Sequence, residues 1–412
     1  MITLLFLFVP LMLGFPIYTG LLLSGGYLLI FGYGVPADML VTSMFDGVAK
    51  FSLSAVPFFL FAGCVMERTS IAARLVGCFT PWLIRARGGI SIAAVCANEV
   101  FGAMSGSAPA AAGTIGKAMF PIVSKDSGES FALGLFASCG ALAIIMPPSI
   151  NMIIFATSTN VSISRLFKAG IIPALIIGLF LSAYLVKKSK PVSPDNKFDI
   201  NYAMKSLWRG LPALSLPVLI LGGIYGGIFT PSEAGAISAV YALIVAKFIF
   251  NEINWKIIIA CLRDTVKLTG QIFILIAAST VFSQALAIAQ VPAMLGNALS
   301  GLSEVSFLVL MNIVLLIAGA FFDPTSAILI LAPVFIPISA THGIDPIHAG
   351  IIFTINLAIG MFTPPFGLNL FVIQGIFNKP MEVIAKSIVP FFFVYLVCLV
   401  IFTFCPQLYM WL

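Results

Sequence analysis

Two stretches of the chain, far apart in the sequence, carry the same series of helix-breaking residues. The first stretch passes from Ser105-Gly106-Ser107 through Pro121 to Pro147-Pro148-Ser149. The second stretch passes from Asp323-Pro324-Thr325-Ser326 through Pro337 to Thr363-Pro364-Pro365. The interval between the single proline and the Pro-Pro pair is 26 positions in the first stretch (147 − 121) and 27 in the second (364 − 337). Helix breaks at matching places in two halves of a membrane chain indicate a transport site near the middle of the bilayer.

The composition assigns the chain to the membrane. Hydrophobic residues make up 60% of its 412 positions, charged residues make up only 9%, and the mean hydropathy is +1.13. No soluble core requires so apolar a chain. Lysines and arginines lie scattered at segment ends, so the net charge of +6 indicates topology-setting charge and no nucleic-acid partner. We therefore predict an all-α polytopic membrane protein in a lipid bilayer.

Apolar runs of the length that spans a bilayer, about 20 residues, recur along the chain. The full-length runs cover 2–32, 166–186, 211–229, 234–250, 269–289, 307–322 and 388–412. Shorter runs cover 53–66, 78–84, 90–101, 131–154 and 350–376. The run at 2–32 has no basic leading region and no small-residue cleavage site, so we expect a first membrane helix and not a removed signal. The most polar stretch, 187–209, separates the two halves, and its lysines predict a cytoplasmic position.

The matched breaks predict an inverted-topology repeat whose halves are residues 1–205 and 206–412. Each half is expected to hold a re-entrant hairpin, about 90–121 and about 315–338, because a polar tip separates two apolar runs too short to span. Each half is also expected to hold a discontinuous helix, about 131–158 and about 348–377, because consecutive prolines break a helix. With the connector in the cytoplasm and an odd number of crossings in each half, we expect both termini to lie outside.

The helix breaks offer oxygen atoms suited to a small cation and to an anion. Non-helical backbone is tolerated in lipid only where it is buried in protein or lines a watery cavity. Freed carbonyls and tip hydroxyls suit Na⁺, whereas the N-termini of half-helices suit a carboxylate. Asp323 is either a functional ionisable group or a helix cap. Asn151 and Asn369 bind either substrate or backbone, and Glu99 and Lys117 beside the first tip are candidates for an ion pair.

Other functions stay open beside Na⁺-coupled transport. No Gly-x-x-x-x-Gly-Lys-Ser/Thr loop is present that would bind ATP. A proton-coupled or stand-alone anion transporter needs a titrating carboxylate, for which Asp323 is the only placed candidate, and a channel would pass Na⁺ without substrate. An intramembrane hydrolase would use Ser105 or Ser107 as its nucleophile. The only histidines, His342 and His348, lie in a loop far from that tip in sequence, so we do not expect an enzyme.

The residues around the breaks resemble a known family signature. Phe101 to Ala108, followed by Met146-Pro147-Pro148-Ser149, is similar to the first-half signature of the large membrane subunit of tripartite ATP-independent periplasmic (TRAP) transporters. The resemblance covers essentially the whole chain and continues through Val56-Pro57-Phe58-Phe59, Leu166-Phe167-Lys168-Ala169-Gly170, Thr230-Pro231-Ser232-Glu233-Ala234, Gly343-Ile344-Asp345-Pro346 and Thr363-Pro364-Pro365-Phe366-Gly367. Pro324 in the second tip departs from the pattern, where a more flexible residue is expected.

The resemblance implies an Na⁺-driven, elevator-type importer of the ion transporter superfamily in the bacterial inner membrane. It implies a small four-helix membrane subunit and a periplasmic substrate-binding protein that delivers small organic anions such as C4-dicarboxylates or sialic acid. The sodium ligands would be Ser105, Gly106, Ser107, Pro147, Ser149, Asp323, Thr325, Ser326, Gly360, Thr363 and Pro364. The substrate ligands would be Ser107, Ser149, Asn151, Thr325, Pro365 and Asn369. Seven cysteines form no Cys-x-x-Cys pair, so we expect buried packing for them, no transition metal and no other cofactor.

Overall fold

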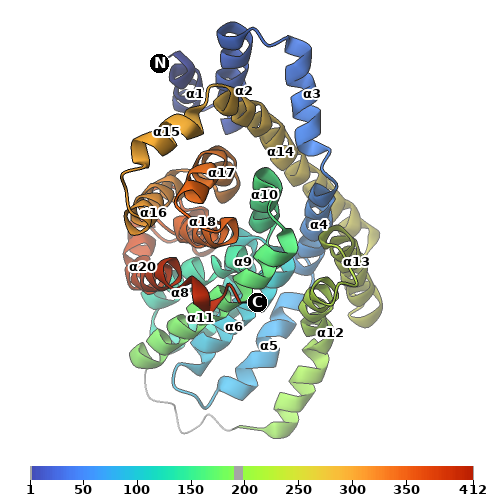
Figure 1. Ribbon diagram of the computed structural model, residues 1–412. Coiled ribbons are helices and arrows are strands. Elements are labelled where there is room, and N and C mark those ends of the chain that lie inside the picture. Colours follow the sequence, from blue (N-terminus) through green and yellow to red (C-terminus); the bar gives the residue numbers. More distant parts are fainter. Residues whose placement is uncertain (1, 190–197, 412) are drawn as a thin grey trace.

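The protein is helical throughout the part that the structure, a computed structural model, describes, which is residues 2–189 and 198–411 (Figure 1). Within this part no β-strand occurs. Seven helices are long and apolar enough to cross a membrane, and the number rises to nine if each of two bent helix pairs counts as one span. The prediction of an all-α polytopic membrane protein is therefore confirmed.

The helices of the first half lead from the N-terminus to the connector. They are α1 (Ile2–Met12), α2 (Ile17–Tyr27) with a π-helical turn (Leu28–Gly32), α3 (Ala37–Val48), a 3₁₀ turn (Phe51–Ser54), α4 (Ala55–Glu67), α5 (Ile71–Leu83), α6 (Gly89–Ser105), α7 (Ala108–Ser127), α8 (Glu129–Cys139), α9 (Leu142–Ile145), α10 (Ile150–Thr159) and α11 (Ile163–Lys188).

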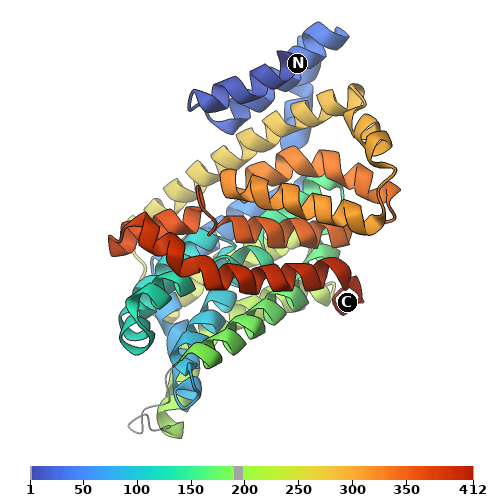
Figure 2. The same cartoon turned by 90° about the vertical axis from the view of Figure 1, so that its left-hand side faces the viewer.

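The helices of the second half follow the connector. They are α12 (Ile200–Tyr225), α13 (Pro231–Ile244) with a π-helical turn (Val245–Ile249), α14 (Trp255–Ile288), α15 (Val291–Leu299), α16 (Glu304–Phe321), α17 (Pro324–Thr341), α18 (Pro346–Gly360), α19 (Leu368–Phe377), α20 (Met381–Phe404) and a 3₁₀ turn (Pro406–Leu408). In Figure 2, the axes of α16, α17 and α20 lie across the molecule, and α14 is inclined to them.

Features of the first half recur at a constant spacing in the second half. Three pairs of features are 217 positions apart (245 − 28, 390 − 173 and 364 − 147): the π-helical turns that begin at Leu28 and Val245, the helix-internal prolines Pro173 and Pro390, and the Pro-Pro pairs that begin at Pro147 and Pro364. The helix α11 also has its counterpart in α20 at this spacing, to within two residues at each end. These features thus recur in the second half at the spacing they have in the first.

Each half contains a helical hairpin with its turn at the predicted tip. In the first, α6 ends at Ser105 and is followed by Gly106, whose φ of +60° favours glycine, and the Ser107 hydroxyl caps α7 by accepting from the Ala110 amide at 3.4 Å. In the second, Asp323 caps α17 by accepting from the Ser326 amide at 3.1 Å. Pro324 takes the first helical position, where its missing amide has no intrahelical partner to lose. The arms, 89–127 and 304–341, are longer than the sequence predicted.

Each half also contains a broken helix at its Pro-Pro pair. In the first half, helical structure stops at Ile145 and resumes at Ile150, and the segments before and after the break are inclined by 41°. In the second half, helical structure stops at Gly360 and resumes at Leu368. Both breaks lie inside the predicted ranges, because a proline has no amide to donate to the preceding turn.

The two hairpins approach from opposite ends of α11, a helix of 26 residues and about 39 Å. At the C-terminal end of α11, the Arg87 side chain just before α6 donates to the Ser189 carbonyl at 2.8 Å. At the N-terminal end, Arg165 and Lys168 share a cavity wall with Ile347, which lies just after the second hairpin. The first hairpin is therefore rooted at the connector end of the molecule, and the second is rooted at the opposite end.

The first predicted span was wrong, because the apolar run 2–32 forms two helices. The helix α1 ends at Met12, and the turn that follows contains Gly14 at φ +83° and Pro16 before α2. The two short helices pack against each other (Figure 1). The prediction used only the length and hydropathy of the run and therefore missed this turn, although Gly14 and Pro16 are sufficient to predict it.

Other predicted boundaries also need correction. The sequence did not predict α3 or α15, and α14 begins at Trp255 instead of 269. The last helix lies at 381–404 and ends before Pro406, instead of covering 388–412. The connector 187–209 is largely helical at its ends, since α11 continues to Lys188 and α12 begins at Ile200, whereas its central residues 190–197 lie outside the described part.

The two halves differ most in the helices that precede the hairpins. The helices α3 and α4 are bent by 57° at residues 49–50, whereas the positions 217 later fall at the start of and within the single helix α14. At this bend, the Lys50 ammonium donates to the Thr157 carbonyl and to the Asn160 side-chain oxygen, 3.3 Å away, at the end of α10. The bend is thus attached directly to a helix that follows the first Pro-Pro break.

Candidate functional site

Each hairpin tip is held beside a Pro-Pro break by a close helix contact four residues earlier. A Cβ atom added at Gly360, four positions before Pro364, would lie 2.3 Å from the Gly319 carbonyl oxygen. A Cβ atom added at Gly102 would lie 2.6 Å from the Cα of Ala143, which is four positions before Pro147. The two contacts are themselves 217 positions apart (319 − 102 and 360 − 143). Backbone therefore meets backbone beside both breaks.

The first break is buried and leaves oxygen atoms without hydrogen-bond donors. The carbonyls of Ala143 and Ile144 would normally accept from residues 147 and 148, which are prolines. In the described part of the chain, neither carbonyl accepts another hydrogen bond. The Ser149 side chain is fully buried, and its hydroxyl has no partner among the described residues. Unpaired buried oxygens of this kind are suitable ligands for a hard cation.

The second break is open to the surface, and its carbonyls are occupied. The Gly360 carbonyl accepts from the Thr363 amide at 3.1 Å, and the Met361 carbonyl accepts from the Asn369 amide at 2.9 Å. The Thr363 hydroxyl donates to the Ile359 carbonyl at 2.7 Å. The side chains of Pro364 and Pro365 are exposed, whereas Pro147 and Pro148 are buried. The two breaks thus share a Pro-Pro pair at the common spacing of 217 positions but not their chemical environment.

The tips and breaks of the two halves meet through α10. The Thr325 hydroxyl in the second tip donates to the Asn151 side-chain oxygen at 3.1 Å. A Cβ atom at Gly106 in the first tip would lie 3.4 Å from the Ile150 amide nitrogen, so this tip covers the N-terminus of α10. Predicted ligands from both halves, Ser105 to Ser107, Ser149, Asn151 and Thr325, therefore surround the first turn of α10.

The remaining predicted ligands make local contacts. Asn369 donates to the Ala137 carbonyl at 2.8 Å, so of its two predicted roles it takes the backbone one, although its side-chain oxygen is buried without a partner. Asp323 accepts from both the amide and the hydroxyl of Ser326, so of its two predicted roles the capping one is seen. Each helix after a break packs against the other half's hairpin, α10 on α17 and α19 on α7.

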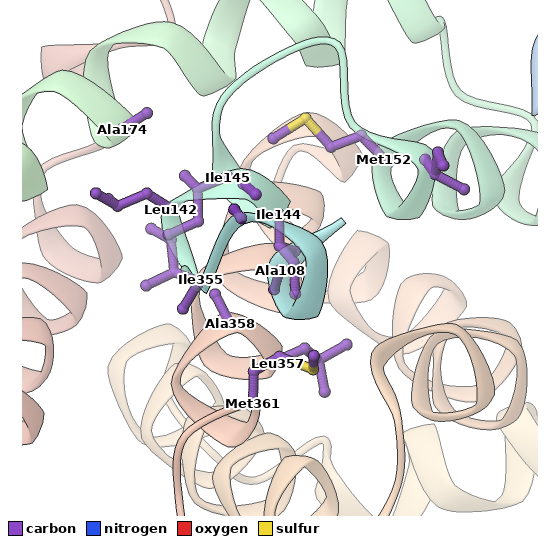
Figure 3. Packing of buried hydrophobic residues seen from close by; sticks show 14 of the residues in the cluster. Ala108, Leu142, Ile144, Ile145, Met152, Ala174, Ile355, Leu357, Ala358 and Met361 are labelled. Atoms are coloured by element: carbon purple, nitrogen blue, oxygen red, sulfur yellow. The ribbon is translucent and has the colours of Figure 1, made fainter. Parts of the chain in front are cut away.

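Apolar packing fixes the segments around the first break. The helices α9 and α18 pack against each other, and α7 packs against α9. Figure 3 shows Leu142 and Ile145 of α9 with Ile355 and Ala358 of α18 and with Ala108 at the start of α7, all in one apolar cluster. These side chains are fully buried, so the polar atoms of the break are held in a dry and rigid frame.

A cavity of about 780 Å³ leads to the first tip. Residues of α4, α5, α7 and α14 line it, and both Ser105 and Ser107 contribute to its wall. Five charged side chains surround it: Glu67, Arg68, Lys117, Asp264 and Lys267. The sequence did not predict the role of Arg68, Asp264 or Lys267, because they are distant in sequence and lie at the ends of apolar runs. The only feature of the sequence that could have identified these three residues is a charged side chain next to a membrane segment.

The predicted pair of Glu99 and Lys117 does not form. Lys117 is exposed in the cavity, whereas Glu99 is buried against α11, where a Cβ atom at Gly178 would lie 1.9 Å from its carboxyl oxygen. That oxygen has no hydrogen-bond partner among the described residues. The pairing was wrong because the two side chains point to different faces of the first hairpin.

The structure bears on the hydrolase alternative and on the expected burial of the cysteines. His342 lies within hydrogen-bond distance of the carbonyls of Ile338 and Leu299, and His348 bonds to the Tyr409 hydroxyl. Among the described residues, neither ring forms a hydrogen bond with a serine of the first tip, so the hydrolase alternative gains no support. The expectation that all cysteines are buried was wrong, since Cys405 is exposed and Cys64 is half-buried in the wall of the cavity.

The comparisons with known proteins agree with the sequence pattern. The family model described as the DctM component of tripartite ATP-independent periplasmic transporters matches residues 4–408. The C4-dicarboxylate TRAP transporter large permease protein DctM of Pseudomonas aeruginosa is 38% identical over 372 residues, which cover 89% of this chain and 87% of that protein. The isethionate TRAP transporter permease protein DctMQ of Oleidesulfovibrio alaskensis is 34% identical over 404 residues, 97% of this chain and 64% of that protein.

A solved structure resembles the whole fold. The crystal structure of the YdaH transporter of Alcanivorax borkumensis superposes with a TM-score of 0.62 and covers 98% of each chain. The sequences are 16% identical, so this likeness concerns the fold alone. Since the family model spans nearly the entire sequence and the relatives exceed 30% identity, this chain belongs to the large membrane subunits (DctM components) of tripartite ATP-independent periplasmic transporters.

Proposed function

We propose that this chain is the large permease subunit of an Na⁺-coupled importer of a small organic anion. The observation that supports Na⁺ coupling most directly is the first break, where the Ser149 hydroxyl and the carbonyls of Ala143 and Ile144 have no hydrogen-bond partner among the described residues. The first turn of α10 offers free amides and the positive end of a helix dipole beside them. A cation and a carboxylate are thereby accommodated within one small volume between Ser107 and Asn151.

The mechanism we propose is an elevator movement of two inverted repeats, 1–205 and 206–412. The spacing of 217 positions and the opposite entry of the two hairpins along α11 support the inversion. The hairpins and broken helices, with α11 and α20, would carry the site past the helices α1–α5 and α12–α15. Na⁺ and anion would then be exposed to one compartment at a time.

The substrate class and the partners follow from the relatives. The two curated relatives are named for C4-dicarboxylate and for isethionate, both small organic anions. We propose the same class here, with a periplasmic binding protein that delivers the anion. A small membrane subunit is the second proposed partner, supported by the relative named DctMQ, of which this chain covers 64%.

The orientation we propose places the connector in the cytoplasm of a bacterium and the N-terminus in the periplasm. The basic residues Arg85, Arg87, Lys187, Lys188 and Lys205 lie at the connector end of the molecule, as the positive-inside rule requires. The membrane would be the inner membrane, where an Na⁺ gradient and a membrane potential exist. Two Na⁺ ions entering through ~100 mV and a tenfold gradient would release about 7 kcal/mol for uptake.

The experiment that tests this function is uptake in proteoliposomes. The chain is reconstituted with the small subunit and the periplasmic protein encoded next to it, and radiolabelled succinate and isethionate are offered with and without an inward Na⁺ gradient. Accumulation that needs Na⁺ and continues at constant pH is the expected result. Accumulation that follows a pH gradient without Na⁺ would establish the proton-coupled alternative, and Na⁺ current without substrate would establish a channel.

Ser149→Ala separates an ion ligand from a structural hydroxyl. The unpaired buried hydroxyl opposes folding by about 1–3 kcal/mol when no cation is bound. The variant is therefore expected to unfold at a higher temperature than the wild type without Na⁺, but to need about tenfold more Na⁺ for half-maximal uptake. Ser138→Ala is the matched control, because the Ser138 hydroxyl in α8 already donates to the Gly134 carbonyl at 2.8 Å. Equal Na⁺ dependence in wild type and Ser149→Ala would remove Ser149 from the site.

Asp323→Asn tests whether the second tip supplies charge to the site. Asparagine is as good a helix cap as aspartate, so the thermal stability should stay unchanged. Loss of a charged ligand should raise the Na⁺ concentration for half-maximal uptake about tenfold. Asp323→Ala should in addition lower the free energy of unfolding by about 1 kcal/mol, because α17 loses its cap. Normal Na⁺ dependence in Asp323→Asn would show that this side chain only caps α17.

A further inference from the structure

The cavity below the first tip carries a set of charges whose balance suits the release of an anion. Its wall holds three cations, Arg68, Lys117 and Lys267, and two anions, Glu67 and Asp264, which gives a net charge of +1. Arg68 and Asp264 form an ion pair and largely cancel each other. Within residues 2–189 and 198–411, neither Lys117 nor Lys267 has an ion-pair partner. Two free ammonium groups therefore face the cavity, from α7 and from α14.

The cavity lies on the connector side of the tip. Lys117 follows Ser107 by 10 positions (117 − 107), about 15 Å along α7 toward the root of the first hairpin. Next to the cavity wall, the Ser70 amide and the Arg74 guanidinium bind Glu252, and the Arg74 backbone lies against Gly210 in the first half of α12. The lysines thus lie between the first tip and the end of the molecule that carries the connector.

The wall also offers neutral donors beside the lysines. Thr265 is buried, its hydroxyl has no partner among the described residues, and it lines the cavity two positions before Lys267 on α14. Thr114 and Gln271 line the same space. Hydroxyl, amide and ammonium donors together match the oxygens of a carboxylate better than those of a neutral solute.

From this arrangement we propose that the cavity is an exit vestibule, in which Lys117 and Lys267 bind the carboxylate of the transported anion after it leaves the first tip. This inference rests on the proposed transport of an organic anion and adds the residues that receive it on the connector side. The anions Glu67 and Asp264 keep the net charge of the vestibule low, so that binding remains weak enough for release. The lysines are exposed and flexible, so the vestibule selects charge and not the shape of one carboxylate.

The test uses Cys64, which lines the vestibule, as a reporter that does not depend on transport. The purified full-length chain reacts with an anionic and with a cationic methanethiosulfonate, and peptide mass spectrometry follows the modification of Cys64. In the double variant Lys117→Gln/Lys267→Gln, the ratio of anionic to cationic rates should fall about fivefold, because two positive charges leave a wet cavity. Succinate should slow the modification in the wild type and have little effect in the double variant.

A matched control is available on the same two helices. Lys125 in the last turn of α7 and Lys256 in the first turn of α14 are exposed lysines outside the vestibule wall. The variant Lys125→Gln/Lys256→Gln should keep the rate ratio and the protection by succinate. Equal ratios in the two double variants, or equal protection by succinate, would overturn the proposal. Protection with no Na⁺-dependent uptake would instead support the vestibule and contradict the Na⁺ coupling proposed above.

Discussion

Replacing Pro147 and Pro148 together with alanine is expected to reduce Na⁺-driven uptake by about 100-fold, the scale on which disturbed ligand geometry weakens metal sites. The new amides would donate to the carbonyls of Ala143 and Ile144, which accept no hydrogen bond from the described residues of the native chain. Helix α9 would then continue toward α10, and two of the oxygens proposed for Na⁺ would be consumed. Uptake as a function of Na⁺ concentration measures this effect.

Folding of the double variant should be preserved, since a continuous helix gains two hydrogen bonds. Thermal unfolding in detergent should confirm this, with a midpoint no lower than that of the wild type by more than a few degrees. Pro173→Ala is the control, because Pro173 lies inside the uninterrupted helix α11 and its replacement frees no proposed ligand. Wild-type Na⁺ dependence in the double variant would contradict the assignment of the first break as the ion site.

Gly360→Ala is expected to abolish uptake by separating α16 from α18. Its Cβ atom would lie 2.3 Å from the Gly319 carbonyl oxygen and 2.6 Å from the Gly319 Cα, and neither backbone atom can turn away. Such overpacking lowers the free energy of unfolding by about 1–3 kcal/mol, although alanine favours the helix by up to ~1 kcal/mol. The unfolding temperature should therefore fall, and the tip should move relative to the break.

Gly375→Ala is the control, because the same substitution at this position is expected to raise the unfolding temperature instead of lowering it. Gly375 lies in α19 and a Cβ atom there meets nothing within 4 Å, so only the gain in helix propensity remains. Gly319→Ala should be intermediate, since its nearest contact would be the Gly360 Cα at 3.3 Å. From highest to lowest, the unfolding temperatures should follow the order Gly375→Ala, wild type, Gly319→Ala and Gly360→Ala. A Gly360→Ala variant as stable and active as wild type would show that the close contact is not essential.

The helix breaks were predictable because their causes are local. Pro147 and Pro364 have no amide to donate, and Gly106 adopts a φ that other residues avoid. Membrane placement was equally predictable, since it depends on composition. Gly14 and Pro16 indicate a turn between α1 and α2. The prediction missed this turn because the surrounding run is uniformly apolar and its total length matched a single span.

The vestibule and the inequality of the breaks were not predictable from sequence. Arg68 and Asp264 are 196 positions apart (264 − 68), and only the packing of α4 on α14 joins them. The carbonyl of Met361 is occupied because the amide of Asn369, eight positions later, folds back to it, whereas no described residue donates to the carbonyls of Ala143 and Ile144 in the first break. Such differences depend on how a loop closes, which a proline pattern shared by both halves does not reveal.

The bend between α3 and α4 has its counterpart, 217 positions later, within the single helix α14. Under the proposed repeat, two equivalent segments therefore adopt different conformations, one bent and one continuous. In the proposed movement, α3–α4 would straighten while α14 bends, and the site would then face the other compartment. The contacts inside either hairpin would stay unchanged. Lys50 lies at the bend and donates hydrogen bonds to the end of α10. These bonds would have to break when the bend straightens, so Lys50 would stabilise the bent state.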